Sequence, residues 1–565
     1  MKLPPKLASL ASPRGGAQRP SDGRAGAEKL PGAPHSMSAL LAAAARRYGS
    51  APALELPEND ERFNFVELAS RVGGLVATLG GLGVGAGDRI LLALDNRSLM
   101  PAMTFAASEL GAATFAINPG YTPTELEYVL GKMRPRCVVA LPEFCSTHEA
   151  LLAQHVPVVT SVDKATPRSR LFNLQDGPWE SLGSVARLDD VVSYAFSSGS
   201  TGFPKAVPRR QRQWMRIGEI IADGMTLGSD DRVITAQPLY YGDPFYCLMG
   251  TLTSGGCMVI LGRFRSETFI ELLVASRATK FLTIGVVPTM LMNTPVTPLD
   301  RAHRLRVAWS VAVPREIHAD LESRFGCPWY EVYGTAETAT VFMENFSRPD
   351  RHEPGSGWVG APAPGVEVRL IGDDGGTITG DGQGLLEVRS AMVMRGYYRG
   401  DEETARVLTT DGWYKTGDRF LREGARYRFL NREKDIVRRS GENVSAMEVE
   451  EALRRDARVL DAAIVPRPDP VRGEEVWAFL MPAPGQTVAS LESHAEEVLV
   501  EVGRHLARHK VPRFVTVLDA FPRTASEKTV KRELPGLSRG RVFDRVSGEW
   551  SAPPRSADPE LRRQP

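Results

Sequence analysis

A short apolar run that opens into a loop of hydroxyls and glycines constrains this chain more than any other feature. Residues 191–196 predict a buried strand, because a brief apolar run bounded by turn residues is typical of one. Glycines let backbone N–H groups turn toward an anion, while hydroxyls and a lysine add donors and positive charge. The segment therefore predicts a polyphosphate site made of Ser197, Ser198, Gly199, Ser200, Thr201, Gly202 and, after Pro204, Lys205.

This segment differs from the nucleotide loop of kinases and ATPases. That loop has the pattern G-x-x-x-x-G-K-[ST] and leads directly into a helix, whereas here Lys205 follows a proline and precedes Ala206. The alternative is a flexible Ser/Gly linker. The strand before the loop and the fixed Pro-Lys exit argue against it.

The bulk composition limits the class of protein. A chain of 565 residues is too long for one core and predicts two or more domains. A net charge of +1 excludes a global field that would attract nucleic acid or a membrane surface, and no apolar run predicts a membrane span. The five scattered cysteines lack a C-x-x-C pair, which argues against disulfides or a zinc site and favours a cytoplasmic protein.

Helical patterns alternate with short apolar strands from Met37 to about residue 430, which predicts an α/β fold with doubly wound parallel sheets. Glycine-rich turns then separate three strands, which predicts an antiparallel, barrel-like β module, and a small α+β domain follows. The expected strands of these two parts are 89–94, 137–141, 156–162, 258–261 and 280–285, and then 366–371, 384–389 and 426–430. In the small domain we expect helices at 445–455 and 491–509 and strands at 461–466 and 476–481.

The two ends of the chain differ in composition from the rest. Residues 1–36 are rich in Pro, Gly, Ala, Ser and basic side chains, and residues from about 540 are rich in Pro, Arg and Ser. We therefore predict a disordered leader at 1–36, an N-terminal domain at 37–433, a C-terminal lid at 434–539 and a disordered tail at 540–565.

Four more segments follow the first in a fixed order, and together the five resemble the adenylate-forming superfamily. This superfamily includes acyl-CoA synthetases, aryl-CoA ligases, luciferases and adenylation domains, and the resemblance covers roughly residues 37–534. The four segments are YGTAE at 333–337, WYKTGD at 413–418, NREKDIV at 431–437 with SGENV at 440–444, and PRTASEK at 522–528.

The resemblance implies an ATP site around the second segment, a predicted loop after a strand at 329–332. Glu337 would hold Mg²⁺ against phosphate oxygens, which suits a hard cation. Tyr333 would stack on adenine, and Gly334 and Thr335 would line the nucleotide. Ala336 replaces the usual hydroxyl residue, which leaves a phosphate contact to Thr335 or water. Read alone, the segment is a turn before a helix with a stabilising acid.

The next two segments carry the predicted ribose, hinge and coenzyme A positions. The resemblance implies that Asp418, in a turn, accepts hydrogen bonds from the ribose diol and that Arg432 assists ribose or phosphate binding. It implies that the lid rotates about Lys434 and that Gly441 faces the pantetheine tunnel. A turn-capping aspartate and a charged linker between domains are the plainer alternatives.

The last segment supplies the lid lysine. Lys528 matches the residue that bridges the carboxylate and the α-phosphate, although Glu527 stands where glycine is common. An ammonium group suits this position because negative charge develops at the reacting phosphorus and the attacking oxygen. The predicted catalytic residues are therefore Lys528, Glu337, Thr201 and Lys205.

The implied reaction has two steps, with Mg²⁺, ATP and coenzyme A as cofactors. A carboxylic acid is first activated to an acyl-adenylate, and the acyl group then passes to coenzyme A as a thioester. Two alternatives remain open. The enzyme could load an acyl or amino acid onto a carrier protein, or it could adenylate for chemistry other than ligation.

The acid is predicted from the acyl pocket, to which the resemblance assigns Tyr241, Gly242, Asp243 and Trp309. The bulk of Trp309 argues against a very long acyl chain, unless it merely packs in the core. Asp243 would pair with a cationic acid or simply form a turn with Pro244. The C-terminal sequence resembles the branch of carnitine and crotonobetaine ligases. We therefore expect a small or medium acid.

Overall fold

The computed structural model describes residues 34–167, 169–197, 204–284, 286–344, 352–439, 442–523, 529–537 and 541–551. Contacts divide the chain into two compact units. Unit 1 holds Met1–Val313, Ile317–Arg369 and Glu387–Lys415, and unit 2 holds Pro314–Glu316, Leu370–Leu386 and Thr416–Pro565. This division falls at Thr416, so the hinge position at residues 433–434 stays a prediction.

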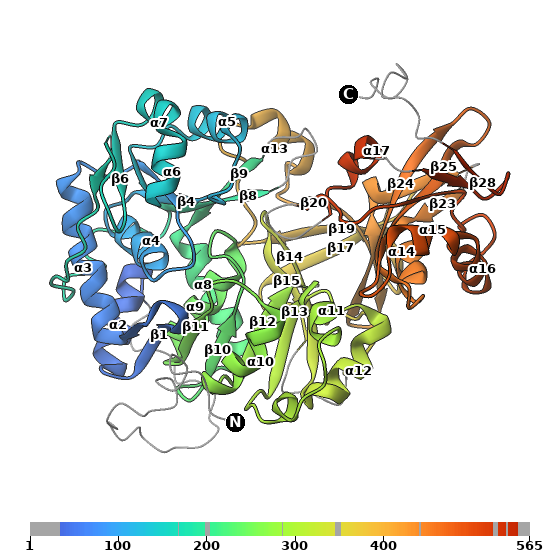
Figure 1. The fold of residues 1–565 in the computed structure, drawn as a ribbon. Helices are drawn as coiled ribbons and strands as arrows, with labels where there is room; N and C mark the ends of the chain where they lie inside the picture. Colours follow the sequence, from blue (N-terminus) through green and yellow to red (C-terminus); the bar gives the residue numbers. More distant parts are fainter. Residues whose placement is uncertain are drawn as a thin grey trace. The chain divides into compact units, whose positions relative to one another are not determined.

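The larger sheet of unit 1 is parallel at its centre and antiparallel at both edges (Figure 1). Its central strands are mostly apolar and mostly buried, as expected for a sheet with helices on both faces. The order is β16 (Ala361–Pro362), β15 (Ala339–Met343), β14 (Trp329–Thr335), β13 (Val307–Val311), β12 (Lys280–Ile284), β10 (Arg232–Thr235), β11 (Cys257–Ile260), β1 (Pro52–Leu56) and β2 (Glu61–Asn64).

The second sheet of unit 1 is parallel except for its last pair, β8 with β9. The predicted doubly wound parallel arrangement is therefore confirmed, and the predicted strands at 89–94, 137–141 and 156–162 are present with slightly shorter bounds. The order is β7 (Arg170–Leu171), β6 (Val158–Ser161), β5 (Cys137–Ala140), β3 (Arg89–Ala93), β4 (Ala113–Ala116), β8 (Val191–Ser197) and β9 (Lys205–Arg210).

The helices between these strands begin at recognisable caps. Thr122 accepts a hydrogen bond from the backbone of Glu125 and the Glu125 carboxylate accepts one in return, which starts α5 at Pro123. The helices are α2 (Met37–Tyr48), α3 (Phe65–Gly81), α4 (Leu99–Glu109), α5 (Pro123–Met133), α6 (Pro142–Thr147), α7 (Glu149–His155), α8 (Gln211–Gly224), α9 (Gly242–Ser254), α10 (Ser266–Ala275), α11 (Val286–Met292), α12 (Arg315–Phe325) and α13 (Asp401–Val407).

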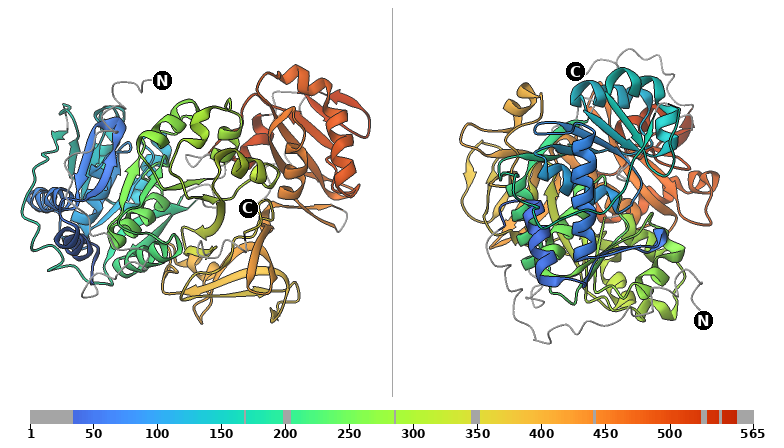
Figure 2. Two further views of the ribbon diagram at one scale, coloured as in Figure 1. Left: turned by 90° about the horizontal axis from the view of Figure 1, so that it is seen from below. Right: turned by 90° about the vertical axis from the view of Figure 1, so that its left-hand side faces the viewer.

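The predicted antiparallel module is a sheet of five strands, with antiparallel pairing between β17 and β18 and between β20 and β21 (Figure 2). Glycine-rich turns join the strands, as the sequence predicts. The order is β18 (Thr377–Ile378), β17 (Val366–Ile371), β19 (Gly382–Ser390), β20 (Tyr414–Glu423) and β21 (Arg426–Arg432).

Unit 2 contains a seven-stranded sheet with helices packed on an apolar core of its own. This is the predicted α+β part of the fold. The strand order is β23 (Glu442–Ser445), β22 (Ile436–Arg439), β25 (Gly473–Pro482), β26 (Phe514–Val517), β27 (Val542–Asp544) and β28 (Glu549–Ser551), with β24 (Val459–Asp469) on β25. The helices are α14 (Ala446–Arg454), α15 (Val488–Ser493), α16 (Ala495–His505) and α17 (Leu534–Leu537).

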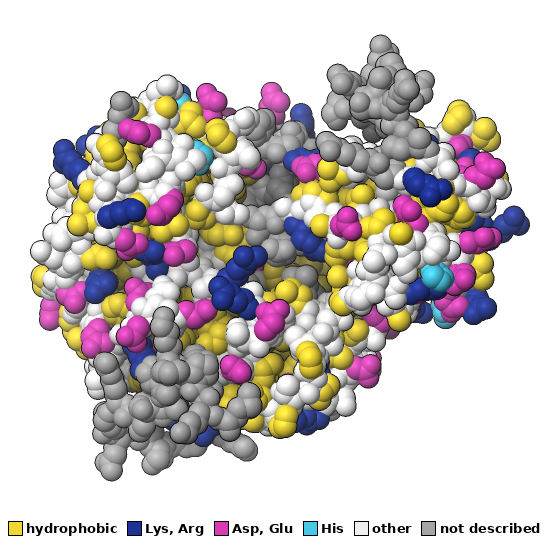
Figure 3. All heavy atoms as spheres, viewed as in Figure 1, with side chains coloured by type: hydrophobic (Ala, Val, Ile, Leu, Met, Phe, Trp, Pro, Cys, Tyr) yellow, Lys and Arg dark blue, Asp and Glu magenta, His cyan; other side chains and the backbone are white. Residues whose placement is uncertain are grey.

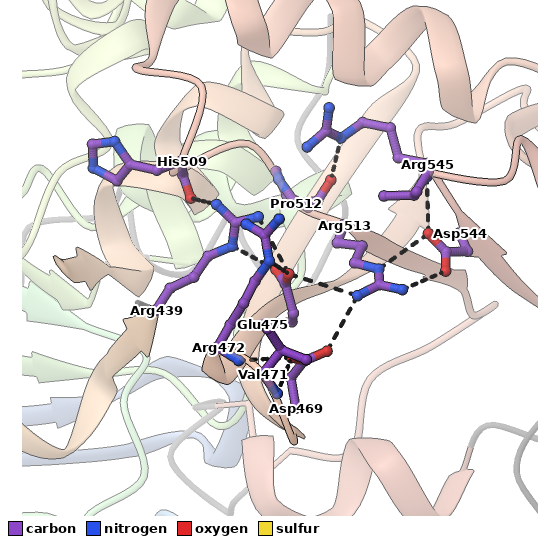
Figure 4. Close-up of polar contacts among 11 residues, drawn as sticks. Arg439, Asp469, Val471, Arg472, Glu475, His509, Pro512, Arg513, Asp544 and Arg545 are labelled. Atoms are coloured by element: carbon purple, nitrogen blue, oxygen red, sulfur yellow. Dashed lines mark hydrogen bonds and ion pairs between the residues drawn. The ribbon is translucent and has the colours of Figure 1, made fainter. Parts of the chain in front are cut away.

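The start of the predicted disordered tail is wrong, because residues 541–551 form the hairpin β27–β28. Phe543 is buried in the core of unit 2, and Asp544 pairs with Arg513 at 3.1 Å (Figure 4). Nε of Arg545 also donates to the carbonyl of Pro512 at 3.0 Å. At the other end, Ser36 caps α2, so the predicted leader is too long by at least this residue.

The predicted single helix at 491–509 is two helices. Nδ1 of His494 binds the carbonyl of Ser490 at 2.7 Å, and His494 has φ −108° and ψ 7°, which interrupts the helix between α15 and α16.

Acidic and basic side chains are interspersed over the face shown in Figure 3, which agrees with the small net charge. Within the described ranges, no helix combines the length and apolar character that crossing a membrane requires.

Candidate active site

The predicted phosphate loop connects the two strands of a hairpin in unit 1. Ser197 ends β8 and lies opposite Lys205, the first residue of β9. The strand predicted before the loop is therefore present, and the lysine predicted after it has a defined backbone position. Residues Ser198, Gly199, Ser200, Thr201 and Gly202 lie outside the described residues.

The predicted loop at 333–337 is partly strand. β14 continues to Thr335 and pairs antiparallel with β15, so Tyr333 and Gly334 lie in a strand rather than in a loop. The backbone of β15 passes so close that a Cβ on Gly334 would lie 2.3 Å from the carbonyl oxygen of Ala339. Only glycine fits there. Tyr333 is buried, with its ring 6.0 Å from that of Phe342.

A tight turn after β14 presents Glu337. The hydroxyl of Thr335 accepts hydrogen bonds from the backbone N–H groups of Glu337 at 3.2 Å and Thr338 at 3.3 Å. The hydroxyls of Thr335 and Thr338 also lie 3.1 Å apart. Thr335 therefore holds the turn from within. A strand follows this turn, where the plainer interpretation of the sequence expects a helix.

The carboxylate of Glu337 is buried, with 6 % of the residue exposed. Its Oε1 accepts a hydrogen bond from the Tyr397 hydroxyl at 3.0 Å. Tyr414 is bonded in turn to Tyr397, and both phenols are buried. Burial and the charge of Glu337 raise the pKa of Tyr397 and of Tyr414, so both remain neutral donors.

Within the described part of unit 1, no lysine or arginine lies within ion-pair distance of Glu337. An ionised carboxylate is rarely buried without a cation or several donors. The position therefore fits a metal ion, whose charge would supply what the described residues do not.

Tyr397 also links Glu337 to the predicted phosphate lysine. The ammonium group of Lys205 lies 5.0 Å from the centre of the Tyr397 ring, over its face. Lys205 and Glu337, which the sequence assigns to one nucleotide site, thus both contact Tyr397. Tyr397 cannot be identified from the sequence, because nothing local marks it and it lies 60 residues from Glu337.

The predicted acyl-pocket residues lie on two elements of unit 1. Tyr241 immediately precedes α9, Gly242 is its first residue, and a Cβ there would lie 3.2 Å from the Tyr246 hydroxyl. Asp243 lies in the first turn, where the helix dipole favours an acid. Trp309 lies in β13 with 2 % of its surface exposed. Their roles in a pocket stay predictions.

In unit 2 the structure brings Asp418 and Arg432 together. They face each other across β20 and β21, and Nε of Arg432 lies 2.9 Å from Oδ1 of Asp418. Asp418 is 1 % exposed and lies in a strand, not in the predicted turn, although its N–H still bonds the Thr416 hydroxyl. Their role at a ribose stays a prediction.

The remaining predicted residues are only partly visible. Lys434 lies in a one-turn 3₁₀-helix, Glu433–Asp435, and its side chain is not described. Gly441 and Lys528 lie outside the described residues.

A second cluster in unit 1 has the composition of a metal site. One ligand atom each from His318, Glu322 and His352 lie within 4.8 Å of one another. However, Nδ1 of His318 accepts the N–H of Gly355 at 3.0 Å, so the proton is on Nε2, which donates to the carbonyl of Trp329 at 2.8 Å. Because Nε2 then has no lone pair for a metal, the cluster is a hydrogen-bonded clamp.

Comparison with known proteins gives consistent results. The model of the AMP-binding enzyme family matches residues 41–398, and that of the AMP-binding enzyme C-terminal domain matches residues 448–528. A sulfoacetate–CoA ligase from Cupriavidus necator is 29 % identical, covering 88 % of this chain and 97 % of that protein. An indoleacetate–CoA ligase from Aromatoleum aromaticum is 27 % identical, covering 87 % and 96 %.

Among solved structures, an amide bond synthetase from Marinactinospora thermotolerans is 26 % identical. It superposes with a TM-score of 0.76 and covers 87 % of this chain and 99 % of that one. Similarity to all three proteins therefore extends over nearly the full chain.

Proposed function

Because the chain belongs to the AMP-binding enzyme family and is an acid–thiol ligase, we propose that it forms its acyl-adenylate beside Glu337 in unit 1. The observation that supports this most is the buried carboxylate of Glu337, which receives a phenol hydrogen bond but no cation within the described residues. The ligase uses ATP to activate a carboxylic acid and then forms a thioester with coenzyme A.

Glu337 is the residue that would hold Mg²⁺. Its carboxylate oxygens are the hard ligands that this ion prefers, and the neutral phenol of Tyr397 orients the group without consuming its charge. Bound there, Mg²⁺ would neutralise charge on phosphate oxygens.

The remaining phosphate contacts come from residues around the hairpin β8–β9. Ser197, Ser198, Gly199, Ser200, Thr201 and Gly202 would cradle the β- and γ-phosphates, and Lys205 would add a cation at the loop exit. Tyr333, Gly334 and Thr335 would line the nucleotide. Lys528 would bridge the carboxylate and the α-phosphate while the substrate oxygen attacks and pyrophosphate leaves.

Unit 2 supplies the second half of the proposal. Asp418 would accept the ribose diol, and Arg432 would keep its carboxylate ionised and oriented. Rotation about Lys434 would withdraw Lys528 after adenylation and bring Gly441 to the thiol. Exclusion of water in each state protects the reactive anhydride from hydrolysis.

We propose a small carboxylic acid as the substrate. Two similar ligases act on sulfoacetate and indoleacetate, which supports this class more than a carnitine-like acid or a long fatty acid. Tyr241, Gly242, Asp243 and Trp309 would form the acyl pocket.

Pyrophosphate exchange on a panel of acids tests this proposal. The panel contains sulfonated, short-chain, aryl, amino, trimethylammonium and long-chain acids. We expect exchange with at least one small acid and AMP plus a thioester when coenzyme A is added. Exchange with long-chain acids alone would contradict the proposed substrate class.

The acceptor is tested in a second set of reactions with the acid identified above. Coenzyme A, a holo carrier protein, a primary amine and no acceptor are compared by product analysis. The reaction with a primary amine is included because the chain is similar to an amide bond synthetase. A thioester with coenzyme A is expected, and a product formed only with another acceptor would redirect the second step.

A further inference from the structure

Arg209 is a buried arginine four residues after Lys205 in β9, and 1 % of its surface is exposed. A guanidinium stays charged under all ordinary conditions, so burial is costly unless an acid or several acceptors compensate it. Across the described ranges, no carboxylate lies within ion-pair distance of Arg209, and its Nε has no partner.

The guanidinium of Arg209 binds three groups from three separate segments. Nη1 donates to the carbonyl of Met392 at 3.1 Å, and Nη2 donates to the hydroxyl of Tyr246 in α9 at 3.2 Å. Nη2 also donates to the carbonyl of Ala336, the residue directly before Glu337. One planar side chain therefore joins β9, α9, the 392 segment and the turn after β14.

These contacts meet at the backbone of Glu337. Arg209 holds the carbonyl on its N-terminal side, and the N–H of Met394 donates to the carbonyl of Glu337 itself at 2.8 Å. Arg209 also fixes Met392, two residues before Met394. The peptide group before Glu337 is thus bound directly by the guanidinium of Arg209. The peptide group after Glu337 is connected to Arg209 through residues 392–394.

We infer that Arg209 is a positioning residue that holds Glu337 in the orientation needed to receive a metal ion. This inference rests on the proposed role of Glu337. Because Arg209 binds the backbone and not the carboxylate, it contributes positive charge nearby and leaves the carboxylate oxygens open. A lysine keeps the charge but lacks the planar set of donors that reaches three acceptors at once.

The test is Mg²⁺ binding in the presence of a nonhydrolysable ATP analogue, measured by titration calorimetry alongside pyrophosphate exchange. Arg209→Lys and Arg209→Leu should each weaken Mg²⁺ binding about tenfold or more, since a small displacement of a ligand has effects of this order. We expect the KM for the acid to change little. Thermal unfolding checks that each variant is folded.

Arg212→Leu is the matched control. Arg212 lies three residues away and pairs with Asp189 at 2.9 Å, with 42 % of its side chain exposed. This variant should bind Mg²⁺ as the unmodified protein does. Folded Arg209→Lys that also binds Mg²⁺ within about twofold of the unmodified protein would overturn the inference, since the lysine lacks the planar fork.

Tyr246→Phe decides the question if both Arg209 variants fail to fold. It keeps the ring, which packs 5.2 Å from Trp214, and removes only the hydroxyl that Arg209 binds. We expect Mg²⁺ binding to weaken about two- to fivefold, in proportion to one lost acceptor of three. Unchanged binding would overturn the inference.

Glu337→Gln separates this inference from the proposed function. If Glu337→Gln abolishes Mg²⁺ binding while the Arg209 variants do not, the positioning role alone is wrong. If Glu337→Gln binds Mg²⁺ normally, the proposed metal role is wrong, and the positioning role fails with it.

Discussion

Two glutamates of unit 1, the half-buried Glu322 and the buried Glu337, lie near opposite ends of β14 and have opposite surroundings. Glu322 Oε1 accepts hydrogen bonds from Nε2 of His352 at 2.6 Å and from the N–H of Trp329 at 2.6 Å, and Nε2 of His318 lies 3.3 Å away. Among the residues that the structure describes, Glu337 Oε1 accepts one bond, from the neutral phenol of Tyr397.

The two carboxylates differ in how many hydrogen-bond donors the described residues supply to them. Burial alone raises the pKa of Glu322, but hydrogen bonds from His318, His352 and the Trp329 N–H outweigh burial and lower it to about 2. Its charge is satisfied within the fold. Glu337 has no such partners among the described residues, and we propose that a ligand completes its surroundings. In this proposal Glu322 stabilises the fold and Glu337 binds a ligand.

The largest effect should come from Glu337→Gln. The amide can still accept the Tyr397 hydrogen bond, so folding should change little, but the charge that would hold Mg²⁺ is lost. We expect pyrophosphate exchange to fall about 100- to 1000-fold, as for the loss of one strong electrostatic contact to the transition state. A rate within about threefold of the unmodified enzyme would remove Glu337 from the site.

Glu322→Gln should do the reverse and reduce stability rather than activity. The substitution leaves two histidines and a backbone N–H facing a weaker, neutral acceptor, which should lower the free energy of unfolding by about 2 kcal/mol. Chemical denaturation measures the loss, and exchange activity of the folded enzyme at 25 °C is the control. If Glu322→Gln were as stable as the unmodified protein but inactive, the roles assigned to Glu322 and Glu337 would be wrong.

The pH dependence of stability sharpens the same contrast. The pKa of Glu322 is about 2 in the folded protein and 4.5 in the reference state, so its contribution is present above about pH 4.5 and is lost toward pH 2. Allowing for solvent screening, we expect this contribution to be about 1–2 kcal/mol. The stability difference between the unmodified protein and Glu322→Gln should shrink on acidification. A difference that stays constant from pH 6 to pH 3 would contradict the assignment.

Sequence patterns predict what is local. The residues of the turn at 333–337 form one contiguous motif, and the alternation of helices and apolar strands indicates both parallel sheets. The motif does not show that β14 continues through Tyr333, because the pairing with β15 that extends the strand depends on residues beyond the motif.

Sequence patterns do not predict contacts made by packing. Arg209 reaches Ala336 across 127 residues and Tyr397 reaches Glu337 across 60, and both contacts exist only once the sheets and α9 are assembled. The prediction of a disordered tail at the C-terminal hairpin is wrong for a similar reason. Its composition resembles a tail, but Phe543 joins the core of unit 2 and Arg513 pairs with Asp544. No spacing rule connects these partners.

Tyr397→Phe should have a smaller effect than Glu337→Gln, and it tests whether the phenol hydrogen bond orients the Glu337 carboxylate. The ring remains, so the contact with Lys205 is kept, but Glu337 loses its only hydrogen bond to a side chain among the described residues. We expect exchange to fall about fivefold to tenfold, the size of one neutral hydrogen bond. Tyr414→Phe removes the hydroxyl behind Tyr397 and should cost less. A larger effect of Tyr414→Phe would mean that the two phenols act as one network, so the double variant, compared with the two single ones, measures their coupling.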